Sequence, residues 1–227
     1  MDCFKKVKKP KVHGFTDKNK KKRFDRAMPL YDLIKDGKYK KIITSDEAWF
    51  CLPGQAKQTD FQYILKSQNR SVCETVKKIS HSKKLMVWVA FSVDRVFTPI
   101  FVKSEAKINK EYYIKDVLEP FLLEAKDYMI EGDYVFQQDS APSHTAKKTR
   151  KFLKDEKIKW ITPEQWMPYS PDVAPCDFWL WGYLKGRINK LNIKALSQLK
   201  KAIIRECSLI PQKYAKRQWH QCQKGLD

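Results

Sequence analysis

Three aspartates stand where regular secondary structure is expected to begin, end or be interrupted. Asp46 lies inside the apolar-flanked segment IITSDEAWF, Asp139 follows the strand-like run YVFQQ, and Asp177 opens a helical segment after a proline-rich loop. Two carboxylates 4 Å apart repel each other by about 4 kcal/mol at an effective dielectric constant of about 20. A converging set of three therefore requires protonation, a basic partner or a bound cation.

A bound cation gives this set a chemical purpose. Carboxylate oxygens are the ligands of Mg²⁺ and Mn²⁺, which complete their coordination with water and substrate phosphate. Two such ions roughly 3.5–4 Å apart activate a nucleophile on one side of a phosphodiester and stabilise the leaving oxygen on the other. The sequence therefore predicts metal-dependent cleavage or transfer of a phosphodiester.

Each acid taken alone also has a structural explanation. Asp46 could mark a strand bulge or an exposed strand face, and Asp139, before Ser-Ala-Pro, could form a turn. Asp177 could simply favour the N-terminus of a helix. Their joint placement is what favours a metal site.

The acids can meet only if a sheet and its helices bring them together. Apolar runs predict strands at 40–51, 60–67, 84–92, 95–104, 133–138 and 158–164. Helical spacing predicts helices at 109–130, 144–156, 176–188 and 195–207, and one starting at Thr16. A hairpin meander followed by alternating strands and helices predicts an α/β fold with a mixed sheet flanked by helices. Parallel pairing of the first strand with 133–138 would place Asp46 beside Asp139.

Composition points to a polyanionic partner. The 227 residues are 42% hydrophobic and carry a net charge of +20, so the chain can bury a core and should attract nucleic acid first and an anionic membrane surface second. No apolar stretch approaches the roughly 20 residues that span a bilayer, and no signal core is present. Six cysteines without regular spacing indicate free thiols in a reducing compartment.

The N-terminal 23 residues form a distinct basic segment. They hold 10 Lys/Arg against 2 acidic residues, which predicts an arm at 1–23 and one catalytic-type domain at 24–227. The arm is either a phosphate-binding or nuclear-targeting segment or a solvated tail. Beyond it, helical spacing places five residues on one face, with Pro29 expected to perturb the helix: Phe24, Ala27, Met28, Tyr31 and Ile34.

Three motifs strongly resemble the catalytic domain of mariner-type transposases in the Tc1/mariner superfamily: TSDEAWF, QQDSAPSHTA and MPYSPDVAPCDFWLWGYLKGRI. The three catalytic acids of that family match Asp46, Asp139 and Asp177. The gaps contain 92 and 37 residues, and the longer second gap with a third Asp is most similar to the maT branch. The resemblance runs from about Thr16 to the C-terminus.

The resemblance implies an RNase H-like fold with a five-stranded mixed sheet and an active site containing two Mg²⁺ or Mn²⁺ ions. It also implies hydrolytic excision of element ends and strand transfer into double-stranded target DNA. The family acts as a dimer, and residues 52–83 fall where its members carry a loop that clamps the partner subunit. The Pro-Tyr-Ser-Pro-Asp loop is implied to organise the active site. Action on chromosomal DNA implies a nuclear location.

Several neighbours of the triad need separate interpretation. Asp172 is a rival third carboxylate, although its proline-bound loop suits a turn and the motif favours Asp177. Glu47 should point to the opposite strand face from Asp46 and act as a neighbour rather than a ligand. His144 is either an ordinary first-turn helix residue or a contact to the scissile phosphate or Asp139.

Three tryptophans of the C-terminal half are expected to pack in the core: Trp166, Trp179 and Trp181. Trp166 has a second interpretation, because an indole in a loop can stack on an unpaired base.

The N-terminus departs from the family pattern. Family members begin with paired helix-turn-helix modules and a linker, whereas 45 residues precede Asp46 and KKPKVHGFTDKNKKKR resembles the linker alone. We therefore expect an N-terminally truncated transposase. Two other functions stay open: a decayed or domesticated remnant that binds DNA without turnover, and a related ribonuclease that prefers an RNA strand in a hybrid.

Overall fold

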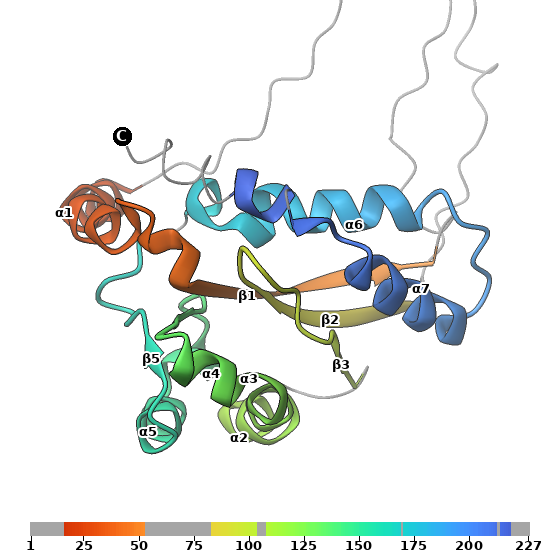
Figure 1. The fold of residues 1–227 in the computed structure, drawn as a ribbon, viewed down its shortest axis with the longest axis horizontal. Coiled ribbons are helices and arrows are strands. Elements are labelled where there is room, and N and C mark those ends of the chain that lie inside the picture. The colour runs from red at the N-terminus through yellow and green to blue at the C-terminus, as the bar shows by residue number, and fades with distance from the viewer. Residues whose placement is uncertain (1–15, 53–82, 104–107, 169, 213, 219–227) are drawn as a thin grey trace, which may run out of the picture.

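A computed structural model describes residues 16–52, 83–103, 108–168, 170–212 and 214–218 of the chain. The predicted strand at 60–67, and nearly all of the segment expected to clamp a partner subunit, lie outside the described residues. None of the helices within these ranges is long and apolar enough to cross a membrane. The described residues form a sheet with helices on both of its faces (Figure 1).

Within the described ranges, five strands make one mixed sheet in the order β3-β2-β1-β4-β5. Their bounds are Ile42–Cys51 for β1, Lys84–Phe91 for β2, Ile100–Val102 for β3, Val135–Gln137 for β4 and Lys159–Trp160 for β5. β1 runs antiparallel to β2 and parallel to β4, and β2–β3 is antiparallel while β4–β5 is parallel. The predicted meander and the parallel pairing of the first strand with 133–138 are confirmed. The last three strands, β3, β4 and β5, are shorter than the predicted 95–104, 133–138 and 158–164.

The helices lie on the two faces of this sheet (Figure 1). One face carries a π-helix η5 (Cys176–Leu180) that continues into α6 (Trp181–Ile188), together with α7 (Leu196–Ser208). The other face carries α2 (Lys110–Tyr112), the π-helix η3 (Tyr113–Leu118), α3 (Glu119–Glu131), α4 (Pro142–Thr145) and α5 (Lys147–Asp155). The N-terminal α1 (Asp17–Ile34) leads through a 3₁₀ turn, η1 (Lys38–Lys41), into β1.

The side-chain alternation of β1 divides the core into two clusters. Ile42, Ala48 and Phe50 pack with α6 and α7, whereas Ile43 packs with η3, α3 and Phe136 on the opposite face. Successive strand residues point to opposite faces, so even-numbered positions of β1 face α6 and odd-numbered positions face α3. This alternation determines which face of the sheet each polar side chain in the middle of β1 points to.

Helix α1 begins as predicted, and its expected apolar face is confirmed at Ile34, which is 3% exposed, and at Ala27, which packs against the core. The Thr16 side chain accepts a hydrogen bond from the Asn19 amide, and the helix continues through Pro29. Leu30 is 2% exposed, whereas Phe24 and Met28 are 83% and 63% exposed. The expected apolar face was therefore wrong for Phe24 and Met28, because Leu30 and Ile34 are the residues that meet the core.

Other helices are confirmed with one correction. The face predicted for 109–130 is buried, since Tyr113, Val117 and Phe121 are each at most 2% exposed. The single helix expected at 144–156 is instead two helices, α4 and α5, separated by Ala146 in an extended conformation with φ −56° and ψ 141°. Helical spacing alone does not report this break, because one extended residue leaves the apolar pattern on both sides intact.

Candidate active site

Asp46 and Asp139 come together at the end of a parallel strand pair. Thr44 is paired with Gln137 in the β1–β4 register, so two further steps along each strand direction reach Asp46 and Asp139. Thr44 donates a hydrogen bond to the Gln137 side chain, which ties the two strands together just before the acids. The short β4 ends at Gln137, and Asp139 therefore projects from the turn that follows.

Asp177 reaches the same place from another part of the chain. It lies in the first turn of η5, which packs against β1 on the α6 face. Asp46, Asp139 and Asp177 all line one cavity of about 480 Å³. Its other walls come from β1, from the turn after β4 and from the loop of residues 166–174. The structure thus brings all three predicted site residues to one cavity.

The charges in this cavity influence one another. Burial raises the pKa of Asp46 to about 7; the indole of Trp181 opposes this rise, while the negative charges of Asp177 and Glu47 add to it. Burial, and then the charge of Asp139, raise the pKa of Asp177. These two acids lack a basic partner among the described residues that would offset their charge. Such a site gains stability when a cation binds.

The Asp46 carboxylate has one strong hydrogen-bond donor. Nε1 of Trp181 lies 2.6 Å from Oδ2 of Asp46 and donates to it. Trp181 is 6% exposed and packs edge-on against Phe50, with ring centroids 6.0 Å apart. The expectation that Trp181 packs in the core is confirmed, but its contact with Asp46 is additional. An indole that both packs and donates fixes the carboxylate relative to helix α6.

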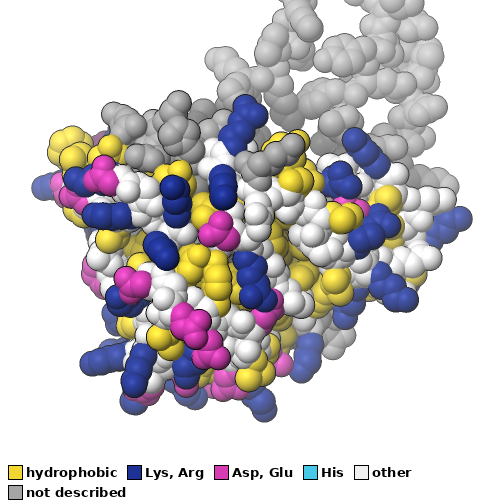
Figure 2. Space-filling view, viewed as in Figure 1, with side chains coloured by type: hydrophobic (Ala, Val, Ile, Leu, Met, Phe, Trp, Pro, Cys, Tyr) yellow, Lys and Arg dark blue, Asp and Glu magenta, His cyan; other side chains and the backbone are white. Residues whose placement is uncertain are grey.

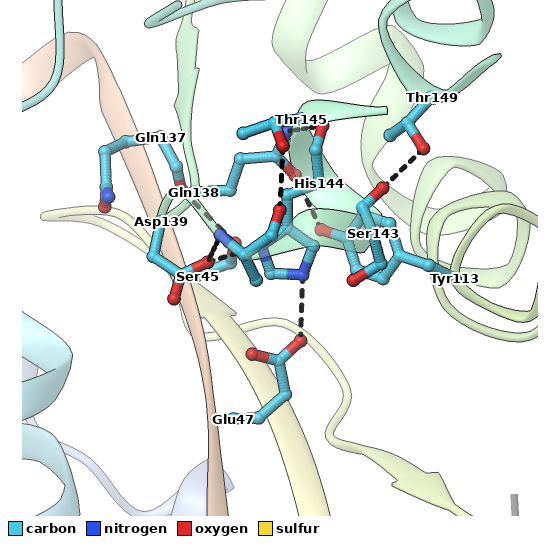
Figure 3. Close-up of polar contacts among 11 residues, drawn as sticks. Ser45, Glu47, Tyr113, Gln137, Gln138, Asp139, Ser143, His144, Thr145 and Thr149 are labelled. Atoms are coloured by element: carbon cyan, nitrogen blue, oxygen red, sulfur yellow. Dashed lines mark hydrogen bonds and ion pairs between the residues drawn. The ribbon is translucent and has the colours of Figure 1, made fainter. Parts of the chain in front are cut away.

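Asp139 has a different set of partners (Figure 3). Its Oδ1 accepts from the Ala141 amide at 2.9 Å and lies 2.6 Å from Nδ1 of His144. The other imidazole nitrogen, Nε2, lies 3.3 Å from Oε1 of Glu47. Although burial favours the neutral acid, His144 and the Ala141 amide hold the pKa of Asp139 below its usual value.

His144 lies between two carboxylates. The imidazole is 3% exposed, so burial disfavours its charged form, but the hydrogen bonds to Asp139 and Glu47 outweigh burial and raise the pKa of His144 to about 9. A carboxylate at each ring nitrogen thus favours the charged form of His144. Of the two interpretations of His144, the structure supports the contact with Asp139. Glu47 faces away from Asp46, as strand alternation predicted, but its contact with His144 was not foreseen.

A basic helix supports the cavity wall. Arg26 of α1 donates to the main-chain oxygens of Pro163 and Trp166 at 2.9 and 2.7 Å, and Arg23 donates to the Ser170 hydroxyl. Trp166, which lines the cavity, is 8% exposed. Core packing of Trp166 is confirmed, and Trp179 also packs against the core in a partly buried position. These arginines fasten α1 to the loop of residues 163–170.

The three carboxylates of the cavity suit a hard divalent cation, although their oxygens do not converge on one point. Within the described ranges, no three His, Cys, Asp or Glu side chains are grouped closely enough to hold a metal ion as they stand. Three carboxylates on one cavity are nevertheless the ligand type of Mg²⁺ and Mn²⁺. Burial, and after it the neighbouring negative charges, raise the pKa of Asp46 and of Asp177, and a bound cation would offset both effects.

The same fold occurs in solved structures of the Mos1 transposase. The Mos1 transposase paired-end complex with the left transposon end has a TM-score of 0.81 at 21% identity, covering 100% of this chain and 65% of that chain. The Mos1 mariner paired-end complex with Mn gives the same values. The catalytic domain of Mos1 mariner transposase has a TM-score of 0.72 at 19% identity, covering 94% of this chain and 93% of that domain. No protein-family model and no curated protein matches the chain.

The fold is that of the mariner catalytic domain. This confirms the predicted RNase H-like architecture, a mixed five-stranded sheet flanked by helices. The chain spans 65% of the Mos1 chain in the paired-end complexes but nearly the whole isolated catalytic domain. In this RNase H-like fold the predicted acids occupy β1, the turn after β4 and the start of η5.

Two sequence interpretations near the site stay predictions. Asp172 lies in the 3₁₀ turn η4 (Pro171–Val173), and its side chain is outside what the structure describes, whereas Asp177 lines the cavity. The domain boundary at residue 23 also stays a prediction, since residues 1–15 are not described and α1 runs from Asp17 to Ile34.

Proposed function

We propose that this chain is the catalytic domain of a mariner-type transposase. It would hydrolyse phosphodiester bonds at transposon ends and transfer the freed strand into target DNA. The observation that carries the proposal is the placement of Asp46, Asp139 and Asp177 on one cavity. The mariner catalytic fold and the three sequence motifs support the same activity.

The three aspartates would hold two Mg²⁺ or Mn²⁺ ions, with Asp46 contributing to both. Bound ions of this kind polarise the phosphodiester and supply a deprotonated water at neutral pH. The protein's own part is positional. Trp181 fixes Asp46 from the α6 face, His144 and the Ala141 amide fix Asp139, and the first turn of η5 presents Asp177.

Charge supports DNA as the substrate. The chain carries a net charge of +20, and Lys and Arg side chains are spread over the face seen in Figure 2, with acidic side chains among them. Such a surface attracts a phosphate backbone without reading sequence. Double-stranded DNA, as transposon end and as target, is therefore the proposed partner. The Mos1 neighbours include paired-end and strand-transfer complexes.

The assembly and location of the protein are also proposed. We expect a homodimer that uses residues 52–83, as the resemblance to mariner transposases implies, and action in the nucleus. Sedimentation of the full chain, compared with a variant in which residues 53–82 are replaced by a short Gly-Ser linker, tests the dimer. Loss of the dimer in the shortened variant supports the proposal, and unchanged sedimentation contradicts it.

Nicking of supercoiled plasmid by the purified chain tests the activity. We expect nicking with Mn²⁺ or Mg²⁺, none with EDTA, and none from the Asp139→Asn variant. Asp155→Asn is the matched control, because Asp155 is exposed on α5, where it pairs with Lys151. Equal activity of the parent and Asp139→Asn would expose a contaminant. Salt-dependent DNA binding without turnover in any metal would favour the remnant that only binds DNA.

A further inference from the structure

The side chains of Glu47, His144 and Asp139 form a chain of polar contacts, with the imidazole of His144 in the middle. The imidazole is 3% exposed and contacts a carboxylate at each ring nitrogen, at 2.6 Å to Asp139 and at 3.3 Å to Glu47 (Figure 3). Glu47 points to the α3 face of β1, whereas Asp139 lines the cavity on the α6 face. The imidazole therefore connects the two faces just beyond the end of β4.

The surroundings of His144 hold the ring in one orientation. The Tyr113 ring lies 4.1 Å from the imidazole at an interplanar angle of 36°, and its hydroxyl donates to Gln138 at 2.7 Å. The Thr149 hydroxyl donates to the Ser143 main-chain oxygen at 2.6 Å, which closes the turn that carries the histidine (Figure 3). A ring packed in this way cannot rotate without breaking several buried contacts.

The two carboxylate oxygens of Asp139 have different surroundings. Oδ1 takes both protein hydrogen bonds, from the Ala141 amide and from His144. Oδ2 has no hydrogen-bond partner among the residues that the structure describes, and the side chain is 52% exposed. A half-exposed aspartate without these bonds would exchange between rotamers. With them, one oxygen is committed to the protein and the other is presented to the cavity.

We infer that His144 and Glu47 are positioning residues for Asp139. Glu47 sets the imidazole orientation through Nε2, and Nδ1 then holds Oδ1 of Asp139, so that Oδ2 is presented for binding of a divalent cation. This inference rests on the proposed function and assigns roles to two residues outside the aspartate triad. It follows the general rule that partners of ligating side chains orient the ligands.

Two substitutions at residue 144 separate positioning from packing. In His144→Asn the amide nitrogen takes the place of Nδ1 and still donates to Asp139; in His144→Gln it takes the place of Nε2 and donates to Glu47 instead. Both changes remove the ring from Tyr113, so a purely structural role would make them equivalent. Thermal unfolding in EDTA establishes that both variants are folded.

Affinity for Mn²⁺ alone, measured by electron paramagnetic resonance without DNA, is the first readout. We expect His144→Gln to weaken Mn²⁺ binding by about 10- to 100-fold, as loss of a ligand's orienting partner does elsewhere. His144→Asn should recover most of that loss. Equal affinities of the two variants, or no loss in either, would overturn the inference. A parent chain that binds no Mn²⁺ would instead contradict the proposed function.

The second readout needs no metal and no activity. In EDTA, the ¹⁵N resonances of the His144 ring are identified by their absence in His144→Asn. Asp139→Asn should shift the Nδ1 resonance, and Glu47→Gln should shift the Nε2 resonance. Those shifts support the contacts of His144 with Asp139 and Glu47 even if the proposed function fails. If Asp139→Asn leaves Nδ1 unchanged, the contact that carries the inference is absent and the inference is wrong.

Discussion

The indole of Trp181 donates a hydrogen bond to Asp46 across the face of the sheet, with 2.6 Å between Nε1 and Oδ2. The two residues are 135 positions apart in the chain. Asp46 lies in the first strand, and Trp181 is the first residue of α6. This contact joins a partly buried acid to the helix that follows Asp177. The ionisation of Asp46 therefore depends on the tertiary structure.

Substitution of Asp46 by asparagine should stabilise the metal-free protein at pH 8. The folded state raises the pKa of Asp46 from an ordinary 3.8 to about 7, so between these values the folded state binds more protons than the unfolded state. Stability contributed at this site is therefore full below pH 4 and falls as the pH rises through 7. Asp46→Asn removes that loss and should gain up to about 4 kcal/mol, since one pKa unit corresponds to about 1.4 kcal/mol.

Urea unfolding of parent and Asp46→Asn in EDTA at pH 4 and pH 8 measures this difference. The difference should nearly vanish at pH 4, where the Asp46 carboxyl is protonated in the folded state and only partly ionised in the unfolded state. Asp155→Asn changes an exposed acid, so its difference in unfolding free energy from the parent should be similar at the two pH values. A variant less stable than the parent at pH 8 would contradict the raised pKa of Asp46.

Replacing Trp181 by phenylalanine should destabilise the protein more at pH 8 than at pH 5. Phenylalanine keeps an aromatic ring near Phe50 but removes the donor that opposes the rise in the pKa of Asp46. We expect a loss of about 1–3 kcal/mol from the missing hydrogen bond at pH 8. The same change made in Asp46→Asn measures packing alone, and a double-mutant cycle gives the difference. Additive losses would argue against a specific contact.

Arg26 should stabilise the cavity wall rather than act only as a DNA-binding cation. Arg26→Met keeps the apolar stem but removes the donors to Pro163 and Trp166, so we expect a loss of about 1–3 kcal/mol in unfolding free energy. Lys22→Met removes the same charge from an exposed position of the same helix. Only Arg26→Met should accelerate proteolysis within residues 163–170. Equal effects of the two variants would show that Arg26 contributes only its charge and does not stabilise the cavity wall.

Asp177, and not Asp172, should be the third acid of the site. Asp177→Asn is expected to lower metal-dependent plasmid nicking by at least about 100-fold, because the interactions of a catalytic metal ligand are worth several kcal/mol. Asp172→Asn should retain activity. Nicking assays with Mn²⁺ on both variants decide between the two acids. Loss of activity in Asp172→Asn with full activity in Asp177→Asn would reverse the assignment.

Most of the architecture could be predicted because its signals are local. Alternating and helical apolar patterns located β1, β2, the helix from Lys110 to Glu131 and α7 within a few residues of their observed bounds. Patterns failed where one residue changed the course of the chain, as Ala146 does between α4 and α5. They also misplaced part of the buried face of α1, since Phe24 and Leu30 are both large and apolar and only tertiary contacts select Leu30.

The candidate site could be predicted to the level of its acids but not of their partners. Asp46, Asp139 and Asp177 were identifiable from their places at strand and helix ends, and the structure sets them on one cavity. The five-residue spacing of Asp139 and His144 offered a signal for their contact. Glu47 offered a weaker one, because a second acid beside Asp46 must face the other side of the strand.

The sequence by itself determined the order of the described elements and the fold class, and it singled out three candidate acids, because short-range periodicity and residue type encode these features. The tertiary structure alone decided which groups control those acids. Trp181 reaches Asp46 across 135 residues, and Arg26 reaches Trp166 across 140. Such contacts have no local pattern, since they depend on how strands pair and how helices pack over the sheet. The ionisation and orientation of the acids are therefore set by the fold.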